Sequence, residues 1–402
     1  MSVDFRSRKD TDTVEPIVPS QFFSQTLAAA LNTHAQLLAP GISYLAVPPF
    51  SFDIDGEVWS LVCDGDRVNI IAGDISGASK TRLSQQDFDG LIRDWFTPIT
   101  FFVGGTLDMQ AGSLDDFINC WLILRAALDG RAIYTPGTID FKDRHGQPLD
   151  LNSSFTLDDE PEDISHFLHE AGYLHLRGMF SEAEMAEISV DMDAAAPGYF
   201  DGDGKSWWAE TADGSNHLVR MQYFQKHSAI TDRLLKDPRL LAIGDITGDA
   251  HQHYGLGENA IEALIKPLNV VKGISDLPWH KDCSLGRHSY DCCKLTVGIS
   301  VTGADADSGQ LRVVAGSHRA LMWPSLISPG SHDLPEIDLP TATGDVTVHL
   351  SCTMHMAQAP KDKERRVMYT GFELPVEDRI AAAKSVDRIS VVREGAYKTV
   401  SQ

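Results

Sequence analysis

Basic residues, cysteines and long apolar segments are all scarce in this sequence of 402 residues. Its 34 lysines and arginines are outnumbered by 57 aspartates and glutamates, which gives a formal net charge of −23. This negative charge repels nucleic acid and anionic membrane surfaces, so we expect neither as a partner. No apolar run reaches the ~20 residues that cross a bilayer, so we expect no membrane span. The N-terminus also lacks the apolar core of a signal peptide.

The cysteines are few and scattered, without the CxxC spacing of a redox or zinc site. Two of them are adjacent, which suits neither an ordinary disulfide nor a zinc knuckle. We therefore expect free thiols in a reducing cytoplasm. The six are Cys63, Cys120, Cys283, Cys292, Cys293 and Cys352.

The length exceeds that of one typical domain, and the composition, with 43% hydrophobic and 23% charged residues, is that of a globular protein. We expect residues 1–20 to be disordered or extended, because they are polar and charged. Residues 21–140 read as an α+β domain. A polar, acidic stretch at 141–163 reads as a linker, and residues 164–402 form the second domain.

The pattern of the N-terminal domain predicts a helix, two strands around a turn, a helix, a strand and a last helix. Ser113 and Asp116 form a capping pair at the start of that last helix, and Gly130 ends it. The expected elements are a helix at 21–38, strands at 58–62 and 68–72, a helix at 84–95, a strand at 101–109 and a helix at 113–130.

This region resembles the sterol carrier protein 2 family. The resemblance rests on residues 56–61 (GEVWSL), 84–88 (SQQDF) and 104–108 (GGTLD). It implies a sheet backed by helices around an apolar tunnel that holds lipids, and hence a role in substrate capture. A closed core without a tunnel and a module for homodimer formation are the alternatives.

His280 and Asp282 are two residues apart on an apparently extended segment, so their side chains point to the same side. A second histidine from elsewhere would complete the 2-His-1-carboxylate triad that holds iron and leaves coordination positions open. His251 and His253 form a competing pair, but no carboxylate lies at a matching spacing.

The second half of the chain resembles the phytanoyl-CoA dioxygenases. Residues 164–193 resemble the opening of these enzymes. From residue 272 on, four motifs follow in the family's order: WHKD at 279–282, a glycine turn and GSH ending at His318, GD at 344–345 with a histidine ten residues later, and paired arginines. The resemblance implies that His280, Asp282 and His355 bind Fe(II), and that His318 is structural.

The resemblance further implies that an arginine about eleven residues after the second metal histidine binds the co-substrate 2-oxoglutarate. That spacing selects Arg366 over Arg365. The serine and asparagine that often follow the second histidine in this family are replaced by Ala357 and Pro360, so one hydrogen bond to the co-substrate is missing or comes from elsewhere.

The implied fold is α+β, with a C-terminal double-stranded β-helix (jelly roll) and flanking helices. The implied reaction uses O2 and 2-oxoglutarate, releases succinate and CO2, and hydroxylates, desaturates or cyclises a substrate. A carboxylate at 282 disfavours halogenation, because halogenating relatives have a small residue there. We expect a small apolar substrate such as a terpenoid, steroid or fatty acyl compound. The alternatives are a lipid-binding protein with a degenerate oxygenase domain, and a cupin-like metalloenzyme that does not use 2-oxoglutarate.

Overall fold

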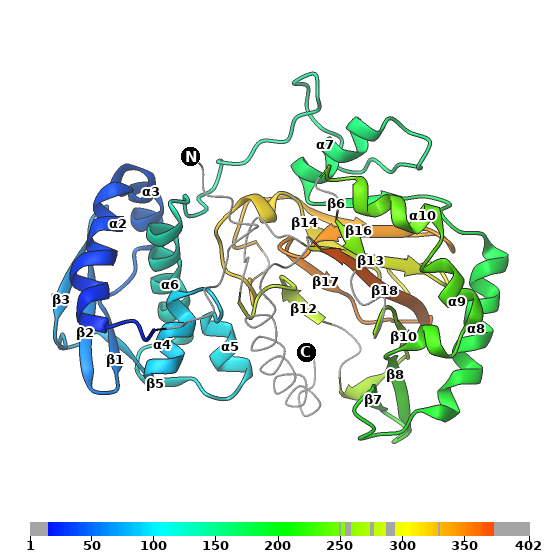
Figure 1. Cartoon of the computed structure of the whole chain (residues 1–402), viewed down its shortest axis with the longest axis horizontal. Helices are drawn as coiled ribbons and strands as arrows, with labels where there is room; N and C mark the ends of the chain where they lie inside the picture. The colour runs from blue at the N-terminus through cyan, green and yellow to red at the C-terminus, as the bar shows by residue number, and fades with distance from the viewer. Residues whose placement is uncertain are drawn as a thin grey trace.

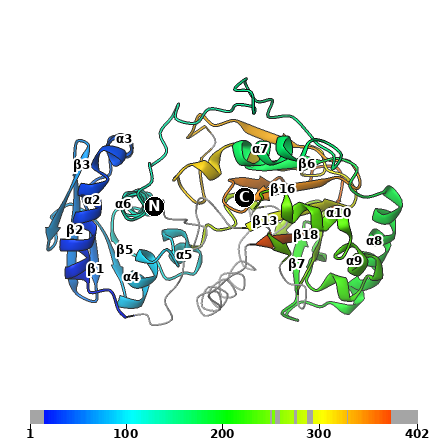
Figure 2. The same ribbon diagram turned by 45° about the horizontal axis from the view of Figure 1, so that its top comes forward.

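The computed structural model describes residues 15–248, 251–253, 259–273, 277–286, 294–328 and 330–373. These residues form two bodies that lie side by side, with the N-terminal one at the left of Figures 1 and 2. Residues 1–14 of the expected extended N-terminus, Cys292 and Cys293 lie outside the described residues. Cys63 and Cys120 are free thiols. Within the described residues, no helix has both the length and the apolar character to cross a membrane.

The N-terminal body is a five-stranded sheet covered by helices. Its helical elements are α1 (Pro19–Gln21), η2 (Phe22–Leu27), α2 (Ala28–Thr33), α3 (Ala35–Leu45), α4 (Gln85–Ile92), α5 (Pro98–Val103) and α6 (Leu114–Asp129). Its strands are β1 (Phe50–Ile54), β2 (Glu57–Asp64), β3 (Arg67–Ala72), β4 (Ser79–Leu83) and β5 (Asp108–Ala111). The strand order is β3-β2-β1-β4-β5, in which only β1 and β4 are parallel.

The predicted start and end of helix α6 are confirmed. The Ser113 hydroxyl accepts from the Asp116 amide, the Asp116 carboxylate accepts from the Ser113 amide, and Gly130 ends the helix at φ +63°. The space between α6 and the sheet is filled by aromatic rings. Phe117 of α6 packs on Phe50 and Phe52 with ring centroids 5.5 and 6.2 Å away. This body therefore has a closely packed core of its own.

The strand expected at 101–109 is wrong in its first half, where α5 forms instead. Pro98 occupies the first turn, where a missing amide hydrogen costs nothing. Thr97 and Thr100 cap that turn reciprocally. A short apolar run such as residues 99–103 fits a buried strand or a buried helix equally well, and here the cap decides.

The stretch expected to be a linker is folded back onto the second body. Residues 142 and 148 form a β-bridge, and Phe141, Leu149, Leu151 and Phe155 pack against the core of the C-terminal body. Helix α7 (Pro161–Ala171) ends at Gly172, which has φ +87°. Strand β6 (Tyr173–Leu176) follows, and Ser181 and Glu184 form the expected capping box of α8 (Glu182–Ala195).

The C-terminal body consists of two antiparallel sheets. Its other helical elements are η3 (Ala196–Gly198), η4 (Phe224–Lys226), α9 (Ala229–Leu234), α10 (Pro238–Leu241), η5 (Ala242–Asp245) and η6 (Ser317–Arg319). Its other strands are β7 (Ser206–Thr211), β8 (Asn216–Met221), β9 (Gln252–His253), β10 (Glu262–Lys266), β11 (Val270–Lys272), β12 (Leu277–His280), β13 (Lys294–Ser300), β14 (Leu311–Val314), β15 (Glu336–Leu339), β16 (Val346–Leu350), β17 (His355–Ala357) and β18 (Arg365–Glu373).

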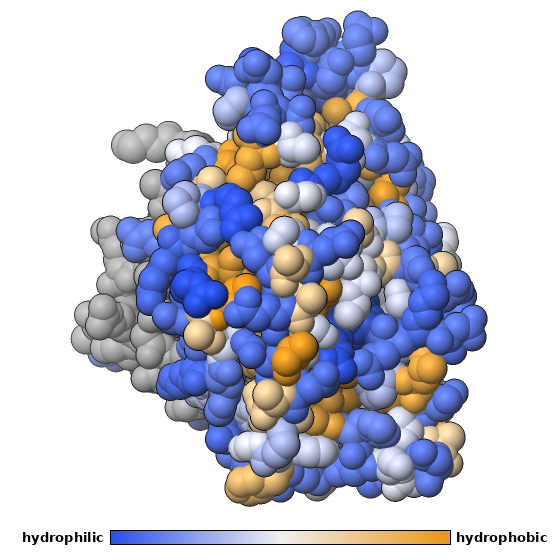
Figure 3. All heavy atoms as spheres, turned by 90° about the vertical axis from the view of Figure 1, so that its right-hand side faces the viewer, coloured by the Kyte–Doolittle hydropathy of each residue, from blue (hydrophilic) through white to orange (hydrophobic). Residues whose placement is uncertain are grey.

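The large sheet has the order β11-β7-β8-β10-β18-β13-β16-β6, with β9 paired to β18, and the small sheet has the order β12-β17-β14-β15. Both sheets bury apolar side chains in one core. Helices α8, α9 and α10 lie on the outer side of the large sheet (Figure 1). The surface on this side is mostly hydrophilic with small separate hydrophobic patches (Figure 3).

Candidate metal centre

Two histidines and one aspartate meet between the two sheets. His280 ends β12, His355 begins β17, and the two are paired across these strands. Asp282 follows β12 by two residues. The Asp282 Oδ1 atom lies 3.8 Å from His280 Nε2 and 3.5 Å from His355 Nε2. One ligand atom from each residue lies within 4.8 Å of the others, which is the spacing a single metal ion requires.

The hydrogen bonds of the two imidazoles fix which nitrogen is available to a metal. Nδ1 of His280 lies 2.7 Å from the Pro278 carbonyl oxygen, and Nδ1 of His355 lies 2.9 Å from that of Thr353. A carbonyl oxygen only accepts, so both Nδ1 atoms carry the proton. The lone pairs of the two Nε2 atoms are then directed at the space beside Asp282. Such outer hydrogen bonds commonly orient metal-binding histidines.

The Asp282 carboxylate is oriented by its outer oxygen. Thr296 of β13 donates to Oδ2 at 2.6 Å, and Nε2 of His349 on β16 lies 3.5 Å from the same oxygen. Oδ1 is thereby left facing the two imidazoles. Burial lowers the pKa of His280 to about 4, and His355 adds to this effect. Burial acts to raise the pKa of Asp282, but His355 and His349 outweigh it and keep this pKa well below its usual range. At neutral pH both groups therefore have the form that binds metal.

The N-terminal body holds the loop that follows Asp282. The Thr97 hydroxyl donates to the Ser284 carbonyl at 2.5 Å, and the Thr100 hydroxyl donates to the Leu285 carbonyl. Gly286 has φ +141° and lies so close to the Trp95 carbonyl that a Cβ at this position would overlap it. The loop is also bonded within its own body, where the Cys283 amide donates to the Ser351 carbonyl.

The two adjacent arginines lie on opposite faces of β18. Arg366 points away from the metal centre toward α8, where its guanidinium donates to the Ser189 carbonyl at 2.9 Å and pairs with Asp193 at 2.9 Å. Neighbouring residues of a strand face opposite sides, so a spacing that is wrong by one residue selects the wrong face.

Arg365 is the arginine on the inner face. Its guanidinium is buried, donates to the Gly309 carbonyl, and lies 3.2 Å from the Tyr369 hydroxyl. It lines a small cavity between the sheets together with Tyr369, Ser300 and Thr347. Gly298 lines the same cavity and faces the same side of β13 as Thr296, which binds Asp282. Arg365 therefore shares its face with the metal centre.

The other candidate histidines lie elsewhere. His253 binds the Thr370 hydroxyl, and His251 binds Thr247. Nε2 of His318 binds the His169 carbonyl at 2.8 Å, in keeping with a structural role. Among the described residues, the group of His280, Asp282 and His355 is the one arranged to hold a metal ion. Thr296, His349 and Arg365 were not among the expected site residues.

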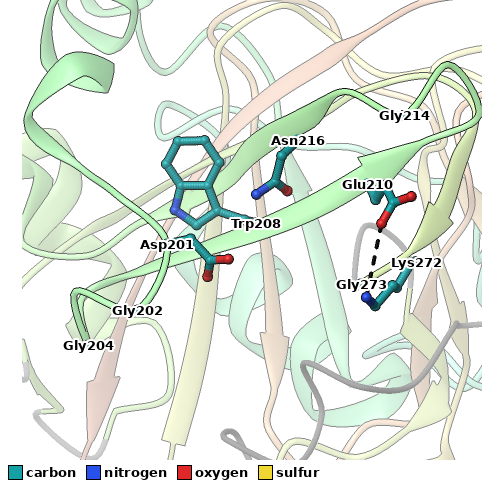
Figure 4. Close-up of a pocket in the computed structure, with 9 residues that line it drawn as sticks. All are labelled: Asp201, Gly202, Gly204, Trp208, Glu210, Gly214, Asn216, Lys272 and Gly273. Atoms are coloured by element: carbon teal, nitrogen blue, oxygen red, sulfur yellow. Dashed lines mark ion pairs between the residues drawn. The ribbon is translucent and has the colours of Figure 1, made fainter.

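A cavity of about 590 Å³ lies at the other end of the large sheet and does not include the metal centre (Figure 4). Trp208, Asn216 and a Glu210–Lys272 ion pair of 4.0 Å line it. The Trp208 indole donates to the Ser206 hydroxyl, so the two side chains are on the same face of β7. Ser206 pairs with Met221 of β8, and Met221 is on the face of the sheet that packs on the helices. This cavity is therefore on the outer face, opposite the metal centre.

The chain resembles several solved structures remotely, and no curated protein matches it. EctD from S. alaskensis, crystallised with 2-oxoglutarate and 5-hydroxyectoine, is 19% identical, with 60% of this chain and 86% of that chain covered and a TM-score of 0.44. AviO1 from Streptomyces viridochromogenes Tue57 is 18% identical, with 54% and 96% covered and a TM-score of 0.41. The non-heme alpha ketoglutarate dependent epimerase SnoN from nogalamycin biosynthesis is 18% identical, with 55% and 88% covered and a TM-score of 0.40.

The sequence profile described as phytanoyl-CoA dioxygenase (PhyH) matches residues 168–368, which is half of the chain. The matched range contains all three residues of the metal group and Arg365. Two imidazoles and one carboxylate fit iron(II), and a buried guanidinium beside hydroxyl groups fits a dicarboxylate. The chain belongs to the phytanoyl-CoA dioxygenase family and is an Fe(II)- and 2-oxoglutarate-dependent dioxygenase.

Proposed function

We propose that His280, Asp282 and His355 bind the iron, and that Arg365 binds the far carboxylate of 2-oxoglutarate. The observation that carries the proposal is the convergence of two Nε2 lone pairs and one carboxylate oxygen within 4.8 Å of one another. Three protein donors would hold the metal and leave it accessible to the co-substrate.

When bound, iron(II) and 2-oxoglutarate supply the oxidation of a C–H bond by O2, with release of succinate and CO2. The chain contributes ligation and orientation. Thr296 and His349 hold Oδ2 of Asp282, so Oδ1 is the oxygen that would face the metal. The carbonyls of Pro278 and Thr353 keep the imidazole planes fixed.

Arg365 suits a carboxylate because a guanidinium donates two parallel hydrogen bonds to it. Tyr369, Thr347 and Ser300 line the same cavity and offer hydroxyl groups. One of these hydroxyls takes the place of the contact that Ala357 cannot make. Side chains alternate between the two faces of β18, which supports Arg365 in this role. Arg366 is on the other face, where it binds Ser189 and Asp193 of α8.

We propose that residues 21–140 and 164–402 are two domains, and that the substrate is a small apolar molecule such as a terpenoid, steroid or fatty acyl compound. The net charge of −23 supports this proposal because acyl-CoA phosphates favour basic sites. The resemblance of residues 56–61, 84–88 and 104–108 to sterol carrier protein 2 is a second support. Free thiols at Cys63 and Cys120 favour a reducing, cytoplasmic location.

The test is turnover of 2-oxoglutarate by purified protein with iron(II) and ascorbate, followed as succinate. We expect slow succinate formation without substrate, faster formation with the right apolar compound, and neither in Asp282→Ala or His355→Ala. Unchanged succinate formation in both variants would contradict the site. Metal binding without any use of 2-oxoglutarate would favour a cupin-like enzyme, and lipid binding without metal binding would favour a degenerate oxygenase.

A further inference from the structure

A second cavity, of about 290 Å³, lies where the two domains meet. Tyr44 of α3 and Leu122 of α6 form its N-terminal wall, and Met322, Trp323 and Ile327 form its C-terminal wall. Helix α6 is on the side of its domain that is nearest to the C-terminal domain in both views (Figures 1 and 2). The domains are joined here by a hydrogen bond of 2.7 Å from Trp323 to Asn119 and by a bridge between Ile133 and Leu321.

This cavity is separate from the metal centre. Tyr134, Met322 and Ile327 pack in one cluster with Trp279 and Met354. Trp279 and Met354 are the chain neighbours of His280 and His355, and neighbouring residues of a strand point to opposite faces. The cluster therefore lies behind the small sheet, and the metal centre lies in front of it.

The walls of the cavity are mainly apolar, and one buried polar side chain lies among them. The imidazole of His332 is only 2% exposed, and neither of its nitrogens makes a hydrogen bond to the residues that the structure describes. The nearest carboxylate oxygen, that of Glu336, lies 4.0 Å from Nε2. A buried imidazole without a hydrogen bond costs free energy that a ligand in the cavity would recover.

The wall is hydrogen-bonded to the strand that carries the first metal ligand. The Leu326 amide donates to the Trp279 carbonyl at 3.0 Å, and the Lys281 amide donates to the Pro324 carbonyl at 3.0 Å. Leu326 itself has φ +60°, a strained conformation for a branched residue that often marks functional segments. A shift of residues 322–328 would therefore move the backbone on both sides of His280.

We propose that this junction cavity binds a small uncharged molecule, largely apolar and with one hydroxyl group, and that its binding alters the metal centre. At liquid density the cavity holds about ten non-hydrogen atoms, since a water takes roughly 30 Å³. A hydroxyl both donates and accepts, so it can pair with either nitrogen of the His332 imidazole. Asp333 and Glu336 lie beside His332 and disfavour an anionic ligand.

The first test uses 4-propylphenol as the probe and calorimetry with the full chain. We expect saturable one-to-one binding that is about tenfold weaker in His332→Phe and restored in His332→Gln, because glutamine also donates and accepts. The anion 3-phenylpropionate should bind more weakly than the phenol. Equal binding by the wild type and His332→Phe, or tighter binding of the anion, would overturn the assigned ligand class.

A blocking variant locates the probe. Ser328 lines the cavity and is exposed, so Ser328→Trp places an indole over the mouth without disturbing the core. Ser24→Trp, on an exposed helical position of the N-terminal domain, is the matched control. We expect binding to be lost in the first variant and kept in the second. Binding that persists in Ser328→Trp, or no saturable binding by the wild type, overturns the site.

Communication with the metal centre is measured by cobalt(II) titration with and without saturating 4-propylphenol. We expect the cobalt dissociation constant to change at least twofold in the wild type and not in Ser328→Trp. Coupling is reciprocal, so cobalt should change the affinity for the phenol by the same factor. An unchanged cobalt affinity in the wild type would overturn the communication. Neither titration depends on turnover, so failure here is distinguishable from failure of the proposed oxygenase site.

Discussion

Replacement of Arg365 or Arg366, one at a time, tests which face of β18 binds the co-substrate. A guanidinium has five N–H donors, and the structure uses Arg365 donors for the Gly309 carbonyl and the Tyr369 hydroxyl. Enough donors remain for two bonds to a carboxylate. Each charge-assisted bond contributes about 1.5–3 kcal/mol. Arg365→Met loses both bonds and should therefore weaken 2-oxoglutarate binding about 10²- to 10⁴-fold.

Arg366→Met should behave differently. Its partners Asp193 and Glu364 are largely exposed, so the loss of these pairs should cost about 1 kcal/mol of unfolding free energy at most. Its effect on 2-oxoglutarate affinity should stay within about twofold, because the side chain is on the other face. Arg365→Lys should bind more weakly than the wild type, since an ammonium group cannot form the two parallel bonds.

The assay is calorimetric titration of 2-oxoglutarate into cobalt-loaded protein, with succinate formation by the iron-loaded protein as a second readout. Thermal unfolding of each variant provides the control for folding. The assignment of the co-substrate to Arg365 is refuted if Arg366→Met loses co-substrate affinity while Arg365→Met keeps it. It is also refuted if both variants bind as the wild type does.

Three further predictions concern the metal ligands and their supports. Thr296→Val removes the hydrogen bond to Asp282 and should weaken cobalt binding about 10- to 100-fold in a calorimetric titration; unchanged affinity would contradict the role of that bond. Thr97→Val should weaken cobalt binding, whereas Thr81→Val, which loses a comparable bond to the Asp108 carbonyl inside the N-terminal domain, should not; equal effects would indicate a general loss of stability. Because burial lowers the pKa of His280 to about 4, this residue stays neutral as the pH falls below 6.5, and its protonation should release cobalt only as the pH approaches about 4. A loss of cobalt centred near pH 6.5 in protein that remains folded would contradict the lowered pKa of His280.

The sequence predicted those features that depend on local chemistry. The caps at Ser113 and Ser181 bind their own next turns, so local spacing is sufficient to place α6 and α8. The meeting of His280, Asp282 and His355 could be expected because the family motifs fix which strands carry them. These predictions used short-range patterns or a resemblance that spans half of the chain.

The features that local patterns do not determine depend on register and on contacts between distant segments. Arg365 and Arg366 are adjacent, and only the pairing of β18 with β10 and β13 decides which of them faces inward. His349 is six residues before His355, and its proximity to Asp282 depends on the pairing of β16 with β13. Helix α5 could not be told from a strand because the mainly apolar run at residues 99–103 is too short to show a period.

Through the hydrogen bonds of Thr97 and Thr100, the N-terminal body helps to position the loop after Asp282 in the C-terminal body. A chain that began at residue 141 would keep the segment that packs against the C-terminal core and would lose the two hydroxyl contacts to the loop after Asp282. Any module that replaced residues 15–140 would have to supply new partners for the Ser284 and Leu285 carbonyls.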